Sequence, residues 1–471
     1  MPESDIDLMA INRGTVIAPA GCGKTELISR ALSRHEGSKP ILVLTHTNAG
    51  VAALRGRLNR ANVRPSAYRL STIDGWARRL ISTFPCRSNH DPAILELKNP
   101  RTDYPNIRRA AAGLLEAGHI GDILGSSFCR MFVDEYQDCS ILQHSFISST
   151  ACVLPTCLLG DPLQAIFGFG MDGLANWEEV TRAFPVAGEL SKPWRWINAD
   201  SKDLGQWLLD IREWLIAGDS VDLGQAPDAV EWVKLDGKND REKHLRAARV
   251  RCGDGAILII GDSKNPDSQR KIASQTPGAV TIEAVDLRDL VTFASDFNPS
   301  SSEHFEILIR FSQKLMTNVG ASELIRRVIS LRSGRARNGP TTIEQSALSF
   351  IDAPSALSAR NLLEEISRGK KVRIYRRTVF RACVTALQQC ADGGGLSFYE
   401  SAIRIREKYR ACGRPLPRRA VGSTLLLKGL EADVAVVLDA DSLDKNNLYV
   451  ALTRGSSALT ICSKTQILSP I

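Results

Sequence analysis

The residues with the clearest chemical potential form a glycine-rich turn near the amino end, Ala18-Pro19-Ala20-Gly21-Cys22-Gly23-Lys24-Thr25. Glycines at two positions let backbone N–H groups approach an anion, and the helix that the turn opens adds the positive end of its dipole. Lys24 supplies a cation for phosphate, and Thr25 supplies a hydroxyl for Mg²⁺. The pattern departs from GxxxxGK(S/T) at Ala18, where the first glycine is missing. We therefore predict a nucleotide-phosphate site made of Ala20, Gly21, Cys22, Gly23, Lys24 and Thr25.

A pair of adjacent carboxylates follows another apolar run, in Phe132-Val133-Asp134-Glu135. We expect Asp134 to hold Mg²⁺ together with Thr25, and Glu135 to orient and deprotonate an attacking water. An Asp-Glu pair at the end of a strand is a weak signal by itself. Because it follows a phosphate-binding loop, it makes hydrolysis of a nucleoside triphosphate with Mg²⁺ the favoured chemistry.

Both segments belong to an alternation of short apolar runs and amphipathic stretches. The first runs lie at residues 15–18, 41–44, 131–133 and 157–159. Each ends in polar residues or glycine, which predicts a parallel α/β sheet with ligands at the carboxyl ends of its strands. Three later runs predict a second sheet, at residues 256–262, 434–438 and 458–461.

Two interruptions of this alternation predict insertions. Prolines punctuate the first, and the second is helical in period and basic. We predict a first sheet domain of residues 1–84 and 129–195 with a small insertion at 85–128, and a second sheet domain of residues 196–300 and 405–471 with a basic helical insertion at 301–404.

The positive charge of the chain is concentrated in one region. The formal net charge is +8, yet residues 301–420 hold 22 Lys/Arg against 10 Asp/Glu, a balance of +12. The remaining residues hold 38 against 42, a balance of −4. A contiguous basic region of this kind is typical of a polyanion-binding surface, and a solvated helical surface is the alternative.

Composition indicates a globular protein of the cytoplasm. Apolar residues make up 43% of the chain and charged residues 24%. No stretch approaches the roughly 18 consecutive apolar residues of a membrane span, and the acidic start MPESDIDLMA lacks the basic region of a secretory signal. Eleven cysteines without a CxxC pair or Cys/His metal spacing indicate reduced thiols. We expect no membrane partner.

Residues 134–138, DEYQD, resemble the DEFQD-type motif II of UvrD/Rep-like DNA helicases, the A branch of helicase superfamily 1. Other segments resemble further motifs of that family, in the family's order. They are residues 45–49 (motif Ia), 71–75 (the TFHG segment), 160–168 (motif III), 192–195 (QNYR), 428–431 (motif V) and 449–454 (motif VI). The resemblance covers residues 15–200 and 421–462.

The resemblance implies two RecA-like domains with the ATP site in the cleft between them, so that the four predicted regions correspond to domains 1A, 1B, 2A and a 2B-like insertion. It implies ATP and Mg²⁺ as cofactors. The family's adenine-reading glutamine segment has no counterpart before Ala18. Nucleotide selectivity is therefore relaxed, or adenine stacks on Trp194, which stands where the family has Tyr. Core packing of Trp194 and Trp196 is the alternative.

The resemblance also assigns catalytic roles by position. Gln164 would sense the γ-phosphate, and Glu135 would be the base. Arg195 and Arg454 would clamp the transferring phosphate from opposite sides of the cleft, because a planar guanidinium stabilises the charge that spreads over its oxygens. Two residues would face the nucleotide from the second sheet, Gly429 and Glu431.

A track for single-stranded DNA is implied in the same way, since such binding uses stacking platforms and polar contacts to the backbone. The matching positions are His46 and Phe169 for stacking, and Thr47, Asn48 and Thr72 for the phosphate backbone. The sequence departs from the family pattern at Asp74 and Leu425, where the family has His, and at Gly170, where it has Arg.

A second DNA surface is predicted in the basic insertion. Residues 368–381 contain seven cations within fourteen residues and no acid. At helical spacing Arg373, Arg376 and Arg377 share one face, which is costly to assemble unless a polyanion compensates the repulsion. We predict that these three residues border the DNA track. Docking of an acidic partner protein is the alternative.

The leading interpretation is an ATP-dependent translocase or helicase on single-stranded or tailed DNA, with 3′-to-5′ polarity implied by the resemblance. The alternative is a DNA-stimulated ATPase subunit that unwinds poorly by itself and regulates a partner nuclease. The chain resembles in size the helicase-like subunit of the Gabija antiphage system, which accompanies an OLD-family nuclease. A P-loop kinase or GTPase is disfavoured by motifs V and VI.

Overall fold

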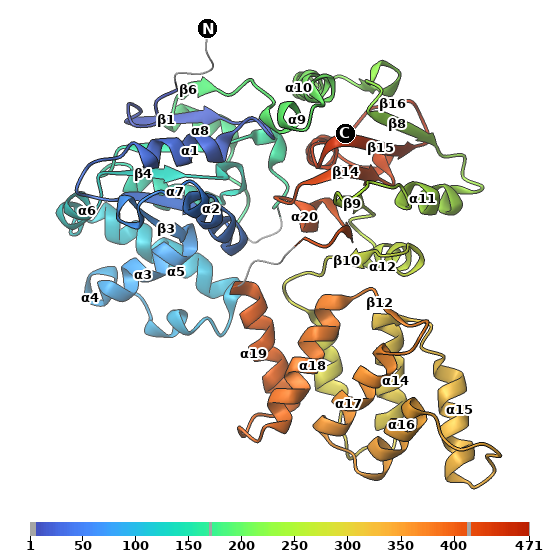
Figure 1. Cartoon of the computed structure of the whole chain (residues 1–471). Coiled ribbons are helices and arrows are strands. Elements are labelled where there is room, and N and C mark those ends of the chain that lie inside the picture. The colour runs from blue at the N-terminus through green and yellow to red at the C-terminus, as the bar shows by residue number, and fades with distance from the viewer. Residues whose placement is uncertain (1–5, 169–171, 412–415, 471) are drawn as a thin grey trace. The chain divides into compact units, whose positions relative to one another are not determined.

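We describe a computed structural model of the chain that covers residues 6–168, 172–411 and 416–470 (Figure 1). The chain forms two compact units. The first consists of residues 1–232, 440–459 and 465–471, and the second of residues 233–439 and 460–464. The predicted domain limits differ from this division, because residues 196–232 and 440–459 belong to the first unit.

The first unit is built on a six-stranded sheet with the order β3-β2-β4-β5-β1-β6. Every neighbouring pair of strands is parallel. The strands are β1 (Arg13–Ile17), β2 (Ile41–Thr45), β3 (Tyr68–Thr72), β4 (Arg130–Val133), β5 (Thr156–Gly160) and β6 (Val186–Glu189). The carboxyl ends of β1, β4 and β5 therefore meet at one edge of the sheet, where ligands bind in such folds.

Helices cover both faces of this sheet, because successive side chains of a strand point to opposite sides. Ile41 and Val43 of β2 pack in one apolar core with α1 (Lys24–Ser33) and α2 (Asn48–Arg60). Leu42 and Leu44 pack in another core with α3 (Ile73–Thr83) and α7 (Ile141–Thr150). Further helices of the unit are α8 (Trp177–Ala183), α9 (Trp194–Asn198), α10 (Lys202–Ala217) and α21 (Lys445–Leu452).

The segment predicted as a small insertion, residues 85–128, is helical. It contains α4 (Pro85–Ser88), α5 (Pro100–Glu116) and α6 (Gly121–Ser127). Ile107, Leu114 and Leu124 join the same apolar core as Leu42 and Leu44 of the sheet. The segment is thus packed into the first unit through the core that α3 and α7 also share.

A second six-stranded sheet has the order β10-β13-β9-β14-β15-β8. The pairs β10–β13, β13–β9 and β9–β14 are parallel. The strands are β8 (Val230–Lys234), β9 (Ile257–Ile260), β10 (Val280–Thr281), β13 (Arg419–Gly422), β14 (Ala432–Val437) and β15 (Gly455–Ser463). Its helices include α11 (Asp240–Ala248), α12 (Pro266–Gln275) and α20 (Thr424–Leu427). The predicted α/β class with two parallel sheets is confirmed.

The second unit also contains a helical bundle with its own apolar core, which runs in sequence from Leu287 to Ile405. Figure 1 shows these helices gathered in one group. They are α13 (Arg288–Asp296), α14 (His304–Leu315), α15 (Ala321–Arg332), α16 (Thr342–Asp352), α17 (Ala356–Ser367), α18 (Arg377–Ala391) and α19 (Phe398–Ala411), with the short strands β11 (Met316–Thr317) and β12 (Arg373–Ile374). No helix among the residues that the structure covers is long and apolar enough to cross a membrane.

Candidate functional site

The glycine-rich turn lies between the end of β1 and the start of α1. Gly21 and Gly23 have φ values of 72° and 88°, in the left-handed region that favours glycine. A Cβ on Gly21 would lie 2.4 Å from a ring carbon of Trp196, so this position also excludes any larger residue by close approach. Burial raises the pKa of the Cys22 thiol between them to about 12, which keeps it protonated.

Lys24 lies between the predicted Mg²⁺ ligand Asp134 and the predicted base Glu135. Its Nζ is 2.9 Å from Asp134 Oδ1 and 2.5 Å from Glu135 Oε1. Burial alone would lower the pKa of Lys24, but the charges of the two carboxylates outweigh it and raise that pKa. Burial raises the pKa of Asp134, against the opposing effect of the Lys24 ammonium. The structure thus brings together the loop cation and the two acids that the sequence predicted.

The same edge of the sheet carries oxygen groups suited to Mg²⁺. Asp134 directly follows β4, and Thr25 is in the first turn of α1 beside Lys24. Carboxylate and hydroxyl oxygens are the hard donors that Mg²⁺ prefers, and the ion usually keeps several waters when it binds with a nucleotide. The donor set therefore fits Mg²⁺ bound together with substrate phosphates.

A hydrogen-bond chain leads away from Glu135. Gln137 Nε2 donates to Glu135 Oε2 at 2.6 Å, and Gln137 Oε1 accepts the backbone N–H of Asp161 at 3.2 Å. Gln164 Nε2 then donates to Asp161 Oδ2 at 3.1 Å. Burial raises the pKa of Asp161, and the nearby Arg212 guanidinium opposes that shift. Gln137 was not among the predicted site residues, although its place in DEYQD was a signal for it.

The two predicted arginine fingers both lie in the first unit and converge on Thr453. Arg195 donates to the Thr453 carbonyl at 2.5 Å, and its backbone N–H donates to the Gly21 carbonyl at 3.1 Å. Arg454 is buried, donates to the Thr453 hydroxyl at 3.0 Å and to the Val450 carbonyl at 2.8 Å. Their expected clamping of a transferring phosphate from opposite sides of a cleft stays a prediction.

Two tryptophans flank Arg195 in α9 and differ in exposure. Trp196 is buried, and its Nε1 donates to the Gly455 carbonyl at 2.9 Å, as a core residue does. Trp194 is 40% exposed, and the Lys192 ammonium lies 3.8 Å from the centre of its ring. Its ring edge is 3.1 Å from where a Cβ on Gly23 would be. Trp194 is thus open beside the loop, and its stacking on adenine stays a prediction.

Tyr449 makes a contact with the loop that the sequence did not predict. Its buried hydroxyl accepts the backbone N–H of Ala20 at 3.3 Å. This N–H belongs to the group expected to bind phosphate. No local signal could have found the contact, because the two residues are 429 positions apart.

The remaining predicted nucleotide contacts lie in the second unit. Gly429 follows α20 and has a φ of 77°, and Glu431 is exposed just before β14. Their expected approach to the nucleotide stays a prediction.

Several residues of the predicted DNA track follow adjacent strands of the first sheet. The rings of His46 and Phe167 are 5.4 Å apart and tilted by 49°. Thr47 accepts the Gly50 N–H at 3.0 Å and caps α2, whose first residue is Asn48. Thr72 accepts the Gly75 N–H at 3.0 Å and caps α3. As caps, these hydroxyls still have a hydrogen to donate to phosphate. Phe169 lies outside the described residues.

Asp74, which departs from the family pattern, belongs to a polar cluster. Both its carboxylate oxygens accept from Arg108 at 2.7 Å, and one also accepts from Gln143 at 3.0 Å. Arg108 also lies 3.2 Å from Asp172, which accepts from Ser140 at 2.5 Å. Asp74 is therefore committed to bonds within the protein, which accounts for the departure.

The prediction that Arg373, Arg376 and Arg377 share one face of a helix is wrong. Arg373 lies in β12 and donates to the carbonyls of Ala273, Ser274 and Ala279. Arg376 is only 1% exposed and precedes α18. Its guanidinium donates to Glu283 at 2.7 and 2.8 Å and to Asp289 at 2.5 Å. Of the three arginines only Arg377 is exposed. The acids that neutralise this segment are distant in sequence, which is why the local pattern misled.

Neither a family model nor a curated protein matches the sequence. Among solved structures, the chain is similar to a complex of arterivirus nonstructural protein 10, a helicase, with DNA, at 12% identity and a TM-score of 0.30. The match spans 57% of this chain and about half of that helicase, 53%. A TM-score this low carries no conclusion, so the family resemblance rests on the motifs.

Proposed function

We propose that the protein is an ATP-dependent translocase or helicase acting on single-stranded or tailed DNA, with 3′-to-5′ polarity. One observation carries the hydrolase part: Lys24 of the glycine-rich loop lies within 3 Å of both Asp134 and Glu135 at the carboxyl edge of a parallel sheet. That is the combination of cation and carboxylates that phosphoryl transfer requires. The ordered motifs carry the DNA part.

In this proposal ATP binding rearranges the ion pairs of the site. Lys24 would exchange its carboxylate partners for phosphate oxygens, and Asp134 and Thr25 would hold Mg²⁺, which would supply positive charge to the phosphates. Glu135, released from Lys24 but still held by Gln137, takes a proton from the attacking water. The Glu135 side chain is thus oriented before and during the reaction.

Arg195 and Arg454 supply transition-state stabilisation. Both are held near Thr453, and Arg195 is also bonded through its backbone to Gly21 of the loop. In this proposal their N–H groups exchange these protein partners for the oxygens of the transferring phosphate. Charge spreads over those oxygens in the transition state, where a guanidinium acts most strongly.

The chain from Glu135 through Gln137 to Asp161 supports a coupling between hydrolysis and DNA. Asp161 is the second residue of the motif III segment, which continues through Phe167 beside His46. A change in the partners of Glu135 can therefore be transmitted to the predicted stacking residue His46. The path consists of the two hydrogen bonds of Gln137 and the motif III segment.

The alternative function, a DNA-stimulated ATPase subunit that regulates an OLD-family nuclease in antiphage defence, is favoured by one observation. Asp74 stands at a position where the family contacts DNA, and its carboxylate is bonded to Arg108 and Gln143. A track that lacks this contact is weaker, which favours ATP hydrolysis on DNA over strand separation.

The test is ATP hydrolysis with and without single-stranded DNA, beside strand displacement on 3′- and 5′-tailed duplexes. We expect hydrolysis that DNA stimulates and that Glu135→Gln abolishes. Displacement from 3′-tailed duplexes alone supports the helicase, whereas stimulated hydrolysis without displacement supports the regulatory subunit. Hydrolysis that no nucleic acid changes would contradict both.

A further inference from the structure

The end of α15 and the turn after it carry an unusual set of side chains. Residues 326–337 contain five arginines, no lysine and no acid. Arg327 is neutralised by Glu344, at 3.0 Å. The other four are exposed, and within the parts of the chain that the structure describes none of them forms an ion pair. We call these four the α15 arginine surface: Arg326, Arg332, Arg335 and Arg337.

The backbone that carries this surface is fixed rather than loose. Gly334 has a φ of 70° and ends the helix, and the N–H of Arg335 donates to the Ser330 carbonyl at 3.0 Å. The chain then turns back toward α16 (Figure 1), where Arg327 donates to the Asn338 carbonyl at 3.4 Å. Thr341 and Glu344 close the turn with reciprocal capping bonds. Arg337 is thereby held next to the helix turn that carries Arg326.

Three other arginines of the bundle, Arg310, Arg360 and Arg368, each pair with a glutamate one turn away. Arg288, Arg377, Arg381 and Arg404 are exposed without an ion pair among the described residues, but they are spread over α13, α18 and α19. The negative end of the α15 dipole is worth only about half a charge, so it balances less than one of the four arginines. No acid among the described residues pairs with them, so their charge is available to a bound anion.

We propose that the α15 arginine surface binds the phosphate backbone of nucleic acid, at a place separate from the motif-based track. Arginine is the residue that matches phosphate geometry with two parallel N–H groups. Residues 321–341, all of which the structure describes, expose one large apolar side chain, Ile329 at 62%. A stable protein interface needs an apolar centre and roughly 800 Å² on each side, which makes an acidic protein the poorer fit.

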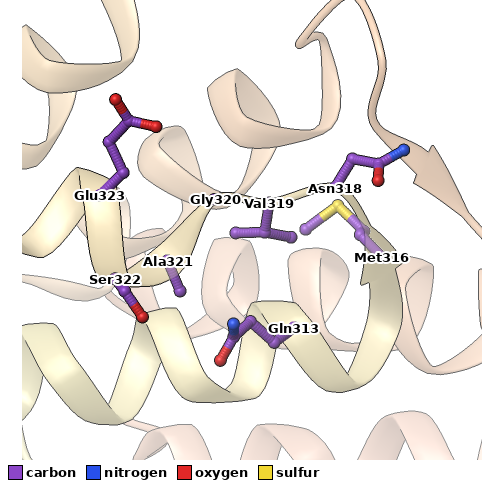
Figure 2. A pocket seen from close by; sticks show the side chains of 8 residues that line it. All are labelled: Gln313, Met316, Asn318, Val319, Gly320, Ala321, Ser322 and Glu323. Atoms are coloured by element: carbon purple, nitrogen blue, oxygen red, sulfur yellow. The ribbon is translucent and has the colours of Figure 1, made fainter.

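The opposite end of α15 provides a contrast. Figure 2 shows a hollow there, lined by Gln313, Met316, residues 318–322 and Glu323. It has polar amides and one carboxylate but no cation. Phosphate binding is thus expected at the carboxyl end of the helix alone.

The test replaces the four arginines by glutamine in the full chain and measures binding of single-stranded and duplex DNA over a range of salt. A matched control removes four scattered exposed cations of the same unit that form no ion pair within its described residues, Lys238, Lys271, Lys314 and Arg404. Each lost phosphate contact lowers the logarithmic salt slope by about 0.7 on single strands or 0.9 on duplex. At about 0.1 M salt this corresponds to a roughly 5- to 8-fold weaker affinity for each contact.

We expect the variant of the α15 arginine surface to bind DNA more weakly and with a smaller salt slope, while the control variant keeps both the affinity and the slope. The rate of ATP hydrolysis without DNA should be the same in both variants and in the wild type. Equal losses in both variants, or no loss in the surface variant, would overturn the proposal. A wild-type protein that binds no nucleic acid would overturn it as well. The proposal rests on the proposed function only for the class of its ligand, nucleic acid. Its failure can be distinguished from failure of the proposed ATP hydrolysis, because Lys24→Ala removes hydrolysis and leaves the α15 arginine surface intact.

Discussion

Removal of the Arg376 guanidinium distinguishes the structural role of this residue from the DNA role that its sequence context predicted. Arg376 bonds both oxygens of Glu283, at 2.7 and 2.8 Å, and one oxygen of Asp289. Arg376→Ala removes from the largely buried Glu283, which also accepts from Thr281, the cation that bonds both of its oxygens. Loss of one partner of a buried pair costs about 3–5 kcal/mol, a large part of the roughly 5–15 kcal/mol that stabilises a domain.

The measurement must resolve the second unit, because two compact units do not unfold in one two-state transition. Amide hydrogen exchange in α18 and β10 reports the local free energy of opening, and we expect it to fall in Arg376→Ala. Arg377→Ala is the matched control, since Arg377 is the exposed neighbour, and its effect should stay within about 0.5 kcal/mol. Arg376→Ala combined with Glu283→Gln should cost less than the sum of the single changes.

The destabilisation caused by Arg376→Ala should also depend on pH. Burial opposes ionisation of Glu283, but the bonds and charge of Arg376 outweigh it and lower the pKa of Glu283 below its ordinary 4.5. An acid whose pKa is lower in the folded than in the unfolded protein stabilises the fold at pH values above its unfolded pKa. This stabilisation is lost as the pH falls through the folded pKa. The difference in the local free energy of opening between wild type and Arg376→Ala should therefore become smaller below about pH 4.5. Unchanged exchange, together with a flatter salt dependence of DNA binding, would refute the structural role.

Three further outcomes follow from the site. Lys24→Ala should weaken ATP binding, whereas Glu135→Gln should bind ATP without turnover; equal loss of binding in both would argue against Glu135 as the base. Arg195→Ala and Arg454→Ala should each lower turnover by roughly 10³-fold or more with little change in ATP affinity, and normal turnover in either would assign that arginine a structural role. Arg108→Ala leaves two largely buried aspartates without their cation and should lower the local free energy of opening by about 3–5 kcal/mol, as measured by amide hydrogen exchange in α3 and α5.

The parts of the fold that the sequence predicted are those that depend on local pattern. All five residues of β2 are buried, and its apolar run between polar neighbours is what a strand covered on both faces requires. The glycine-rich turn, the strand before it and the helix after it were likewise predictable. Their spacing is dictated by the backbone approach to an anion.

The parts that the sequence missed depend on contacts between distant residues. Arg376 meets Glu283 from 93 positions away, and Trp196 meets Gly455 from 259. Val372, Ile374 and Tyr375 interrupt the basic segment with apolar residues, a pattern that favoured the strand β12 over a continuous helix. Neither composition nor charge could show which arginines were already neutralised.

Which cations are paired with acids and which are exposed without a paired acid indicates where phosphate contacts to DNA would form. Around the motif-based track, Arg108 is held by Asp74 and Asp172, so this cluster carries a formal charge of −1. Such a cluster attracts no phosphate, so the predicted track would rely on stacking and hydroxyl contacts, whose salt dependence is small. If DNA binding proves strongly salt-dependent, the phosphate contacts must come from elsewhere. The α15 arginine surface is a place on the described chain with the required unpaired charge.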